Sequence, residues 1–336
     1  MNTLLFTLLI LFAVNSGIYA QESQYFQHLD NGVELYQNQK YSDAGKAFDL
    51  AIAELGGITT QTNFYNAACA WSLANERNKS FFYLQKILHG KMIRGWDDPV
   101  EFYNMLIKDV DFNNIKSDKR WVTIAKKAER KKDIFLKRLD KDIAIRIERI
   151  GEADQKIRTE LDSIRKKDGL NSSAEKKIIK VMRQQDSTNF AAFEEIVKKF
   201  GWLGPEDIGY KNNQYLFLIL QHADLENQQK YLPLFRKSFQ AGKILPKDLA
   251  YLEDRINMRL KRMQQYGSQT IIDNVSKKYV LYPIDNIDGV DYRRAMVGLE
   301  SLKSYIKSSF NIDFDIEQYK RELPKLKERY TDKQNN

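Results

Sequence analysis

The pattern of hydrophobic and polar positions predicts helices along almost the entire chain. From residue 31 to residue 88, small and large apolar side chains recur at the spacing that lets short antiparallel helices interlock. Residues 97–128 repeat this pattern more weakly. We therefore predict two helical hairpins followed by a third, degenerate helical pair.

The residues that carry this pattern resemble those of tetratricopeptide repeats. Gly32 and Ala44 match the small positions of one repeat, and Leu35 matches a large one. Phe48 matches the second large position, and a further copy of the pattern follows between residues 64 and 88. The resemblance implies a stack of hairpins whose concave groove binds a protein or peptide partner. A purely structural spacer is the alternative.

A charged, amphipathic stretch connects these repeats to the second half of the chain. Apolar residues recur about every four positions from Lys119 to Lys167, and only Gly151 interrupts the helical pattern convincingly. Acidic residues break up the basic runs on the opposite face, although the chain carries a formal charge of +9. This mixture is typical of a solvated, ion-paired helix surface, and we expect no nucleic acid partner.

The second half contains a strongly apolar run, Tyr215 to Leu220. Because this run has no polar face, we expect its helix at the centre of a domain. Amphipathic patterns predict further helices around it, whereas residues 279–284 are expected to be extended or irregular. The other expected helices run from near Asp186 to Gly201, from Leu225 towards Gln240, from Pro246 to Gly267, from Ala295 to Ile306 and from Phe314 to Tyr330.

Length and composition favour an all-α fold in two parts. The 336 residues exceed one ordinary core, and 6 prolines with 16 glycines argue against a loop-rich β protein. We expect tetratricopeptide-like hairpins at residues 21–130, a connecting helix at 131–150 and a second helical domain at 151–325. Residues 326–336 are expected to form a disordered tail.

Residues 1–20 have the features of a secretory signal peptide. The segment from Leu4 to Val14 is apolar apart from Thr7, and it is too short to span a membrane. We expect cleavage after Ala20, a mature chain without a transmembrane segment, and a periplasmic or secreted protein. No Lys or Arg precedes the apolar run, and a buried N-terminal helix is the alternative.

Residues 154–305 carry a series of compact polar clusters. They are Asp154-Gln155 with Arg158, Gly201-Trp202, Gln221-His222-Ala223-Asp224, Leu252-Glu253-Asp254-Arg255, Tyr266-Gly267-Ser268-Gln269 and Arg294. This order resembles a bacterial domain family that has no assigned function, in which Thr is common at the position of Ser268. The resemblance implies an all-helical domain, and it implies no reaction.

The sharpest candidate for catalytic chemistry centres on His222. An imidazole beside a carboxylate is suited to proton transfer, and Asp254 or Asp224 is the expected partner. His222 also ends the predicted central helix, where backbone carbonyls favour an imidazolium, and Asp224 is placed to cap the next helix. A structural role for both residues is therefore the alternative.

A small anionic ligand is the expected partner of this second domain. Arg255 or Arg158 is a candidate to hold its charge, and Tyr266 or Gln269 to orient it. Asp154 lies one helical turn before Arg158 and is expected to pair with it. The alternative is that these polar residues only fix the fold.

We expect neither a metal site nor a cofactor. The 3 histidines are far apart in the sequence, and Cys69 lies among small and aromatic residues typical of a buried core position. The first function hypothesis is an exported protein-interaction or ligand-binding protein. The second is a hydrolase-like enzyme with an acid/base centre at His222 and Asp254.

Overall fold

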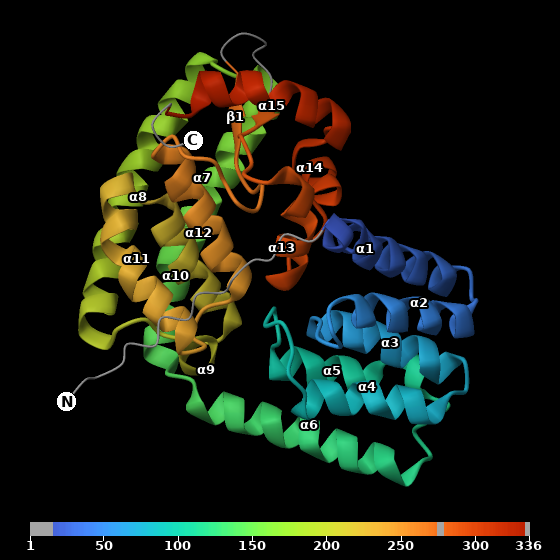
Figure 1. Ribbon diagram of the computed structural model, residues 1–336. Coiled ribbons are helices and arrows are strands. Elements are labelled where there is room, and N and C mark those ends of the chain that lie inside the picture. The colour runs from blue at the N-terminus through green and yellow to red at the C-terminus, as the bar shows by residue number, and fades with distance from the viewer. Residues whose placement is uncertain (1–15, 274–278, 333–336) are drawn as a thin grey trace, which may run out of the picture.

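The computed structural model describes residues 16–273 and 279–332, and its fold is all-α as predicted (Figure 1). These residues form 15 α-helices, arranged mainly as hairpins. Their one sheet pairs two short antiparallel strands, β1 (Thr270–Ile272) and β2 (Tyr279–Leu281). Most of the predicted signal peptide, residues 1–20, lies outside the described residues.

The first six helices form an arm of three stacked pairs. They are α1 (Ser16–Gln37), α2 (Tyr41–Glu54), α3 (Gln61–Leu73), α4 (Arg77–His89), α5 (Pro99–Lys108) and α6 (Lys119–Arg138). The small residues of the pattern sit where helices approach closely. A Cβ atom on Gly32 would lie 2.7 Å from the Phe48 ring, and one on Gly45 would lie 2.5 Å from the Trp71 ring. The predicted helical hairpins are therefore confirmed.

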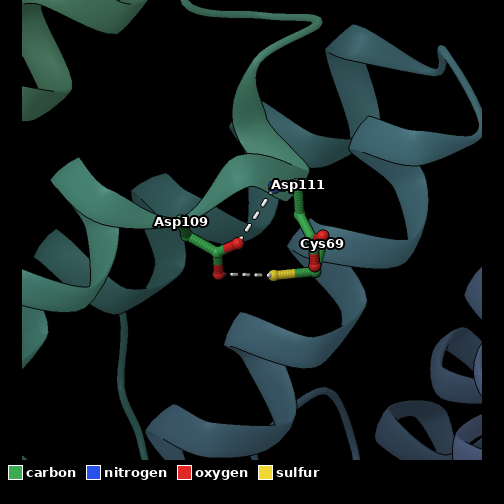
Figure 2. Close-up of side chains that lie close together, drawn as sticks. All are labelled: Cys69, Asp109 and Asp111. Carbon is green, nitrogen blue, oxygen red and sulfur yellow. Dashed lines mark hydrogen bonds between the residues drawn. The ribbon is translucent and has the colours of Figure 1, made fainter.

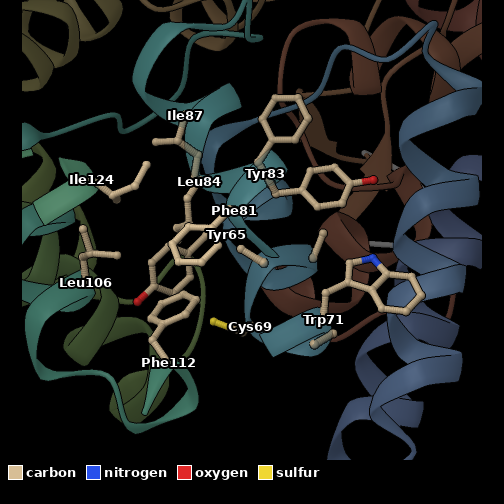
Figure 3. Packing of buried hydrophobic residues seen from close by; sticks show 14 of the residues in the cluster. Tyr65, Cys69, Trp71, Phe81, Tyr83, Leu84, Ile87, Leu106, Phe112 and Ile124 are labelled. Atoms are coloured by element: carbon tan, nitrogen blue, oxygen red, sulfur yellow. The ribbon is translucent and has the colours of Figure 1, made fainter. Parts of the chain in front are cut away.

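One continuous apolar core joins the three helix pairs of the arm (Figure 3). Trp71 and Phe81 are almost completely buried, and burial of side chains this large stabilises a fold by about 1.5–3 kcal/mol each. The polar ends of the aromatic residues are also satisfied, since Trp71 Nε1 and Tyr83 Oη donate to Asp49 at 2.9 and 2.6 Å. Cys69 is 5% exposed, which confirms its expected core position.

The connecting stretch is two helices, and the predicted break at Gly151 is wrong. α6 ends at Arg138, and α7 (Lys141–Asp168) begins after Asp140, whose carboxylate accepts the N–H of Ile143 at 3.1 Å. This N-cap stops one helix and starts the next. Gly151 lies inside α7, where a Cβ atom would come within 2.1 Å of the Tyr215 ring. The glycine therefore permits close packing of α7 against the central helix.

The second domain surrounds α10, as the apolar run predicts. Its first helices are α7, α8 (Ser173–Phe200), α9 (Pro205–Ile208), α10 (Tyr210–His222), α11 (Leu225–Gln240) and α12 (Pro246–Arg259). α10 packs against α7, α8, α11 and α12, and its Leu216 and Leu220 are fully buried. The core around these two side chains includes Phe193, Phe235 and Leu252.

Two helix boundaries in this domain differ from the sequence prediction. α8 begins at Ser173, well before the expected start near Asp186, because Ser172 caps it by accepting the N–H of Glu175. α12 ends at Arg259 and does not continue to Gly267, since Lys261 adopts a left-handed conformation with φ of 54°.

Three shorter helices complete the domain: α13 (Val290–Met296), α14 (Leu302–Phe310) and α15 (Ile316–Tyr330). The single helix expected from Ala295 to Ile306 is divided, because Gly298 has φ of 75° and Ser301 caps α14. The expected disorder from residue 326 is also wrong as far as Tyr330. Leu326 packs into an apolar cluster there, and the Tyr330 carbonyl accepts the Tyr282 hydroxyl at 2.9 Å.

The arm contacts the second domain through α1, the segment after α4 and the end of α6 (Figure 1). Tyr25 on α1 packs into one cluster with Ala295 on α13. Beyond α4, Arg94 pairs with Glu206 at 3.0 Å, and the Trp96 ring meets the Tyr210 ring. Within residues 16–273 and 279–332, no helix is both long and apolar enough to cross a bilayer.

Candidate functional site

His222 is presented by the end of the central helix. It is the last residue of α10, and the chain turns at Ala223 before α11 begins. The next residue, Asp224, accepts the backbone N–H of Asn227 at 2.8 Å and so caps α11. The Asp224 carboxylate therefore has the structural role expected of a helix cap. Among the described residues, it forms no hydrogen bond with His222.

The partner of His222 is Asp154 on α7. The imidazole Nδ1 lies 3.0 and 3.1 Å from the two carboxylate oxygens, and the Asp154 side chain is 1% exposed. Arg158 pairs with the same carboxylate at 2.9 Å, as its spacing predicts, and with Asp186 on α8 at 2.8 Å. Gln155 donates a further hydrogen bond to Asp154 at 2.7 Å. The imidazole thus contacts a carboxylate that neighbouring side chains hold in place.

The protonation states of this pair follow from its surroundings. Burial alone raises the pKa of the Asp154 carboxyl, but the hydrogen bond from His222 and the charge of Arg158 outweigh it and hold that pKa below its usual value. Burial also lowers the pKa of His222, and the guanidinium groups of Arg158 and Arg255 add to this effect against the opposing Asp154. At neutral pH the pair is therefore a carboxylate and a neutral imidazole whose Nδ1–H is the donor.

A cavity of about 420 Å³ opens beside this imidazole. His222 is 17% exposed in its side chain, and no described residue forms a hydrogen bond with its second nitrogen, Nε2. The cavity wall combines charged and polar groups from α8, the α10–α11 turn, α11 and α12. Its lining residues are Arg183, Asp186, Ser187, Phe190, His222, Ala223, Asp224, Asn227 and Arg259.

Two arginines on α12 bring positive charge to this side of the domain. Arg259 lines the cavity, and its Nη1 donates to the carbonyl oxygen of Ala223 at 2.6 Å. Arg255 lies one turn earlier, and its Nε is buried without a hydrogen-bond partner among the described residues. Burial, with the nearby charges of Arg259 and Arg158, lowers the pKa of Arg255 to about 10.

The expected pairing of His222 with Asp254 is not formed. Asp254 is 0% exposed, and its carboxylate accepts the backbone N–H groups of Gln265, Tyr266 and Ser268 at 2.7–3.2 Å. The Ser268 hydroxyl adds a fourth donor at 2.9 Å. The cause is the early end of α12, after which the chain returns across this acid and encloses it.

Tyr266 and Gln269 belong to the same enclosed loop. Arg294 Nη1 donates to the carbonyl of Tyr266 at 2.6 Å, and Gln269 Nε2 donates to Ser268 Oγ at 2.9 Å. The Tyr305 hydroxyl closes the loop by donating to the carbonyl of Ser268. These contacts give the two residues a fold-fixing role, and neither lines the cavity beside His222.

The arm contains a second polar cluster, formed by Cys69, Asp109 and Asp111 (Figure 2). One potential ligand atom from each residue lies within 4.8 Å of the others, a spacing that metal ligands also have. The carboxylates already have donors, because Tyr65 donates to Asp109 at 2.7 Å and Tyr36 donates to Asp111. Burial and the two nearby carboxylates raise the pKa of the Cys69 thiol, which keeps it protonated and unreactive.

Sequence reasoning missed three charged members of the cavity site. Asp186 was expected only as a possible helix cap, because the long helix α8 was predicted to begin there. Arg183 and Arg259 carry no local motif and lie on charged helix faces like many others in this chain. Only their position in the fold identifies them. Arg183 lies on the face of α8, and Arg259 at the end of α12, that line the cavity with His222.

Comparison with known proteins places this site inside one family. The model of a family of unknown function (DUF6624) matches residues 141–313, from the start of α7 to the loop after α14. This range includes His222, Asp154, Arg158, Arg255 and Arg259. No curated protein and no solved structure matches the chain in the corresponding comparisons.

Proposed function

The chain belongs to this family of unknown function, DUF6624, and we propose that its helical domain binds a small polar ligand in the cavity beside His222. The observation that carries the proposal is the contact of His222 Nδ1 with the buried Asp154 carboxylate at 3.0 Å. An Nδ1–H donor bound to a carboxylate sets both the tautomer and the orientation of an imidazole. The ring then offers Nε2 to the cavity as a fixed acceptor.

The surroundings of Asp154 make this arrangement rigid. Its carboxylate is held by Arg158 and Gln155, and Arg158 is anchored in turn by Asp186 on the neighbouring helix. A ring supported in this way loses little conformational freedom when a ligand binds. The cavity volume of about 420 Å³ lies within the range of small-molecule sites.

General acid–base catalysis is the second candidate function, and the same pair of residues favours it. A neutral imidazole with a free Nε2 and a carboxylate on Nδ1 is the arrangement that accepts a proton from a bound hydroxyl or water. The acid in this version is Asp154. Asp254, the partner expected from the sequence, is enclosed by its own loop.

The experiment that tests ligand binding is a thermal-shift screen of the full chain against a library of small polar metabolites. We compare the wild type with His222→Ala and with the matched control His89→Ala, since His89 is also the last residue of a helix but is exposed. A compound that stabilises the wild type and the His89 variant, but not the His222 variant, supports the proposal. A library without such a compound contradicts it.

We propose for the arm that its hairpins bind a protein or peptide partner. The support is the stack of three helix pairs, with exposed apolar residues such as Met105 on α5. Affinity capture with Met105→Glu tests it against Leu50→Glu, a similarly exposed position on α2. A partner retained by the Leu50 variant and lost by the Met105 variant supports binding through α5, and equal capture by both argues against it.

We also propose that the chain is exported and cleaved after Ala20. The support is the apolar segment from Leu4 to Val14, which has the length of a signal-peptide core. Mass spectrometry of the N-terminus of the purified protein tests the proposal. A mature chain beginning at Gln21 is the expected result, and a chain that retains Met1 would exclude it.

A further inference from the structure

We infer that the ligand of the His222 cavity carries a phosphoryl group, or a chemically equivalent protonated tetrahedral oxyanion. It binds to Arg259 in the cavity wall and to Arg255, which lies one helical turn away and is not among the residues that line the cavity. This inference rests on the proposed ligand-binding function and names the class of ligand. Its independent observation is the guanidinium of Arg255, a partly buried residue whose Nε is shielded from water and which has no counter-ion among the described residues. Nε of Arg255 has no hydrogen-bond partner, and no carboxylate lies within ion-pair distance of this side chain among the described residues.

A partly buried guanidinium in this condition is costly. Placing a charged group away from water without a partner costs several kcal/mol, and proteins normally pair such groups. The charge of Arg259 adds to this cost, because it lies close enough to lower the pKa of Arg255. An anion bound by Arg255 and Arg259 would offset the repulsion between their charges.

The acids near the cavity do not supply the missing charge. Asp154 and Asp186 are both paired with Arg158, so that their charges are already used. Asp224 is exposed and caps α11. Neither Arg255 nor Arg259 therefore forms an ion pair among the described residues, although the more distant charge of Asp224 opposes the lowering of the Arg259 pKa.

The geometry of these arginines suits a compact oxyanion. Arg255 and Arg259 are four residues apart on α12, which places them on one face of the helix. Arg259 lines the cavity, and one of its N–H groups donates to the carbonyl of Ala223. The other N–H groups of its guanidinium remain available as donors. Guanidinium forks bind phosphate oxygens with two parallel hydrogen bonds.

His222 adds a different requirement. Its Nε2 is an acceptor at neutral pH, so it repels a bare anionic oxygen and prefers an O–H group. A monoprotonated phosphate, or a phosphate ester with a neighbouring hydroxyl, offers both kinds of oxygen, whereas a simple carboxylate offers only acceptors. This difference is the reason for preferring a tetrahedral oxyanion to a carboxylate.

The test is isothermal titration calorimetry of the full chain with inorganic phosphate, with sulfate and acetate as parallel probes. We expect phosphate to bind at low millimolar concentration or tighter. Sulfate and acetate have no O–H group at neutral pH, and we expect both to bind at least tenfold more weakly. Arg255→Met should weaken phosphate binding at least tenfold. The control Arg236→Met, at an exposed arginine on α11 that pairs with Glu253, should leave it unchanged.

Arg255→Lys is a second variant, for the case in which Arg255→Met does not fold. It keeps the charge but loses the fork, and we expect phosphate binding to weaken severalfold with an unchanged circular dichroism spectrum. The inference is overturned if wild-type protein shows no phosphate binding up to about 10 mM, a concentration that detects even very weak sites. It is also overturned if acetate binds as tightly as phosphate, or if Arg255→Lys binds as the wild type does.

A last variant separates this inference from the proposed function. His222→Gln keeps the arginines and a side-chain acceptor, Oε1, and we expect it to bind inorganic phosphate within about threefold of the wild type. Suppose that phosphate binding depends on Arg255 but that the metabolite response is the same with and without His222. This result would contradict the proposed function and support the anion site. A metabolite response that requires His222 but not Arg255 would support the proposed function and contradict the anion site.

Discussion

Two buried aspartates of the domain, Asp154 on α7 and Asp254 on α12, differ in what they hold. Their side chains are almost equally buried, at 1% and 0% exposure. Asp154 faces other side chains, namely His222, Arg158 and Gln155. Asp254 faces the backbone of the loop that follows its own helix. Burial alone therefore does not tell a site acid from a structural acid, but the type of donor does.

The same contrast appears in their ionisation. Burial raises the pKa of Asp254, and the four hydrogen bonds to its carboxylate only partly oppose this effect. Asp154 is buried as well, but its cationic neighbour and the hydrogen bond from His222 bring its pKa below the usual value. The acid with the lowered pKa is thus the one beside the cavity.

The largest expected effect is a loss of stability on Asp254→Asn. The amide nitrogen of Asn would face N–H groups that now donate to the carboxylate, and each donor left unsatisfied costs about 1–3 kcal/mol. We expect the free energy of unfolding in urea to fall by about 4 kcal/mol. The control Asp224→Asn should be nearly neutral, since Asn caps helices as well as Asp does. An equal effect of the two substitutions would contradict a structural role for Asp254.

Asp154→Asn should destabilise the domain less, by about 2 kcal/mol, because Arg158 keeps Asp186 as its partner. The main effect of this substitution should be on ligand binding beside His222. Without the carboxylate, the pKa of His222 should drop further, and ligand binding that depends on the imidazole orientation should weaken about tenfold. Urea denaturation and the thermal-shift response measure the two effects. A larger stability loss than for Asp254→Asn would reverse the contrast between the two acids.

The smallest effect concerns the pH dependence of stability. The folded pKa of His222 lies below its unfolded value of about 6.5, so its contribution is present above that pH and is lost as the pH falls. Asp154 has a lowered pKa too, but its contribution is lost only at more acidic pH, below about 3.9. We therefore expect wild-type stability to decrease as the pH falls below about 6.5, and His222→Gln to reduce this decrease. An identical decrease in both proteins would contradict the lowered pKa.

Local sequence patterns predicted the parts of this site that depend on one helix. The pair of Asp154 and Arg158 follows from their spacing, and the cap formed by Asp224 follows from its place before an apolar periodic segment. The position of His222 at the end of the central helix was predictable for the same reason. Each of these features is decided within one or two helical turns.

The features that were missed depend on packing between distant segments. The contact of His222 with Asp154 joins residues 68 positions apart, and it exists because Gly151 lets α7 approach α10 closely. Helical periodicity gives no information about such an approach. The enclosure of Asp254 was missed for a related reason, since it depends on α12 ending at Arg259, and the apolar stripe continues to Met263.

The most direct measurement is NMR observation of the His222 side-chain nitrogens in the wild type and in Asp154→Asn. At pH 7 we expect a neutral ring protonated on Nδ1, with a titration midpoint below 6.5, and loss of that tautomer preference in the variant. A ring that is charged at pH 7, or one protonated on Nε2 in the wild type, would contradict the assignment of Nε2 as the acceptor that faces the ligand.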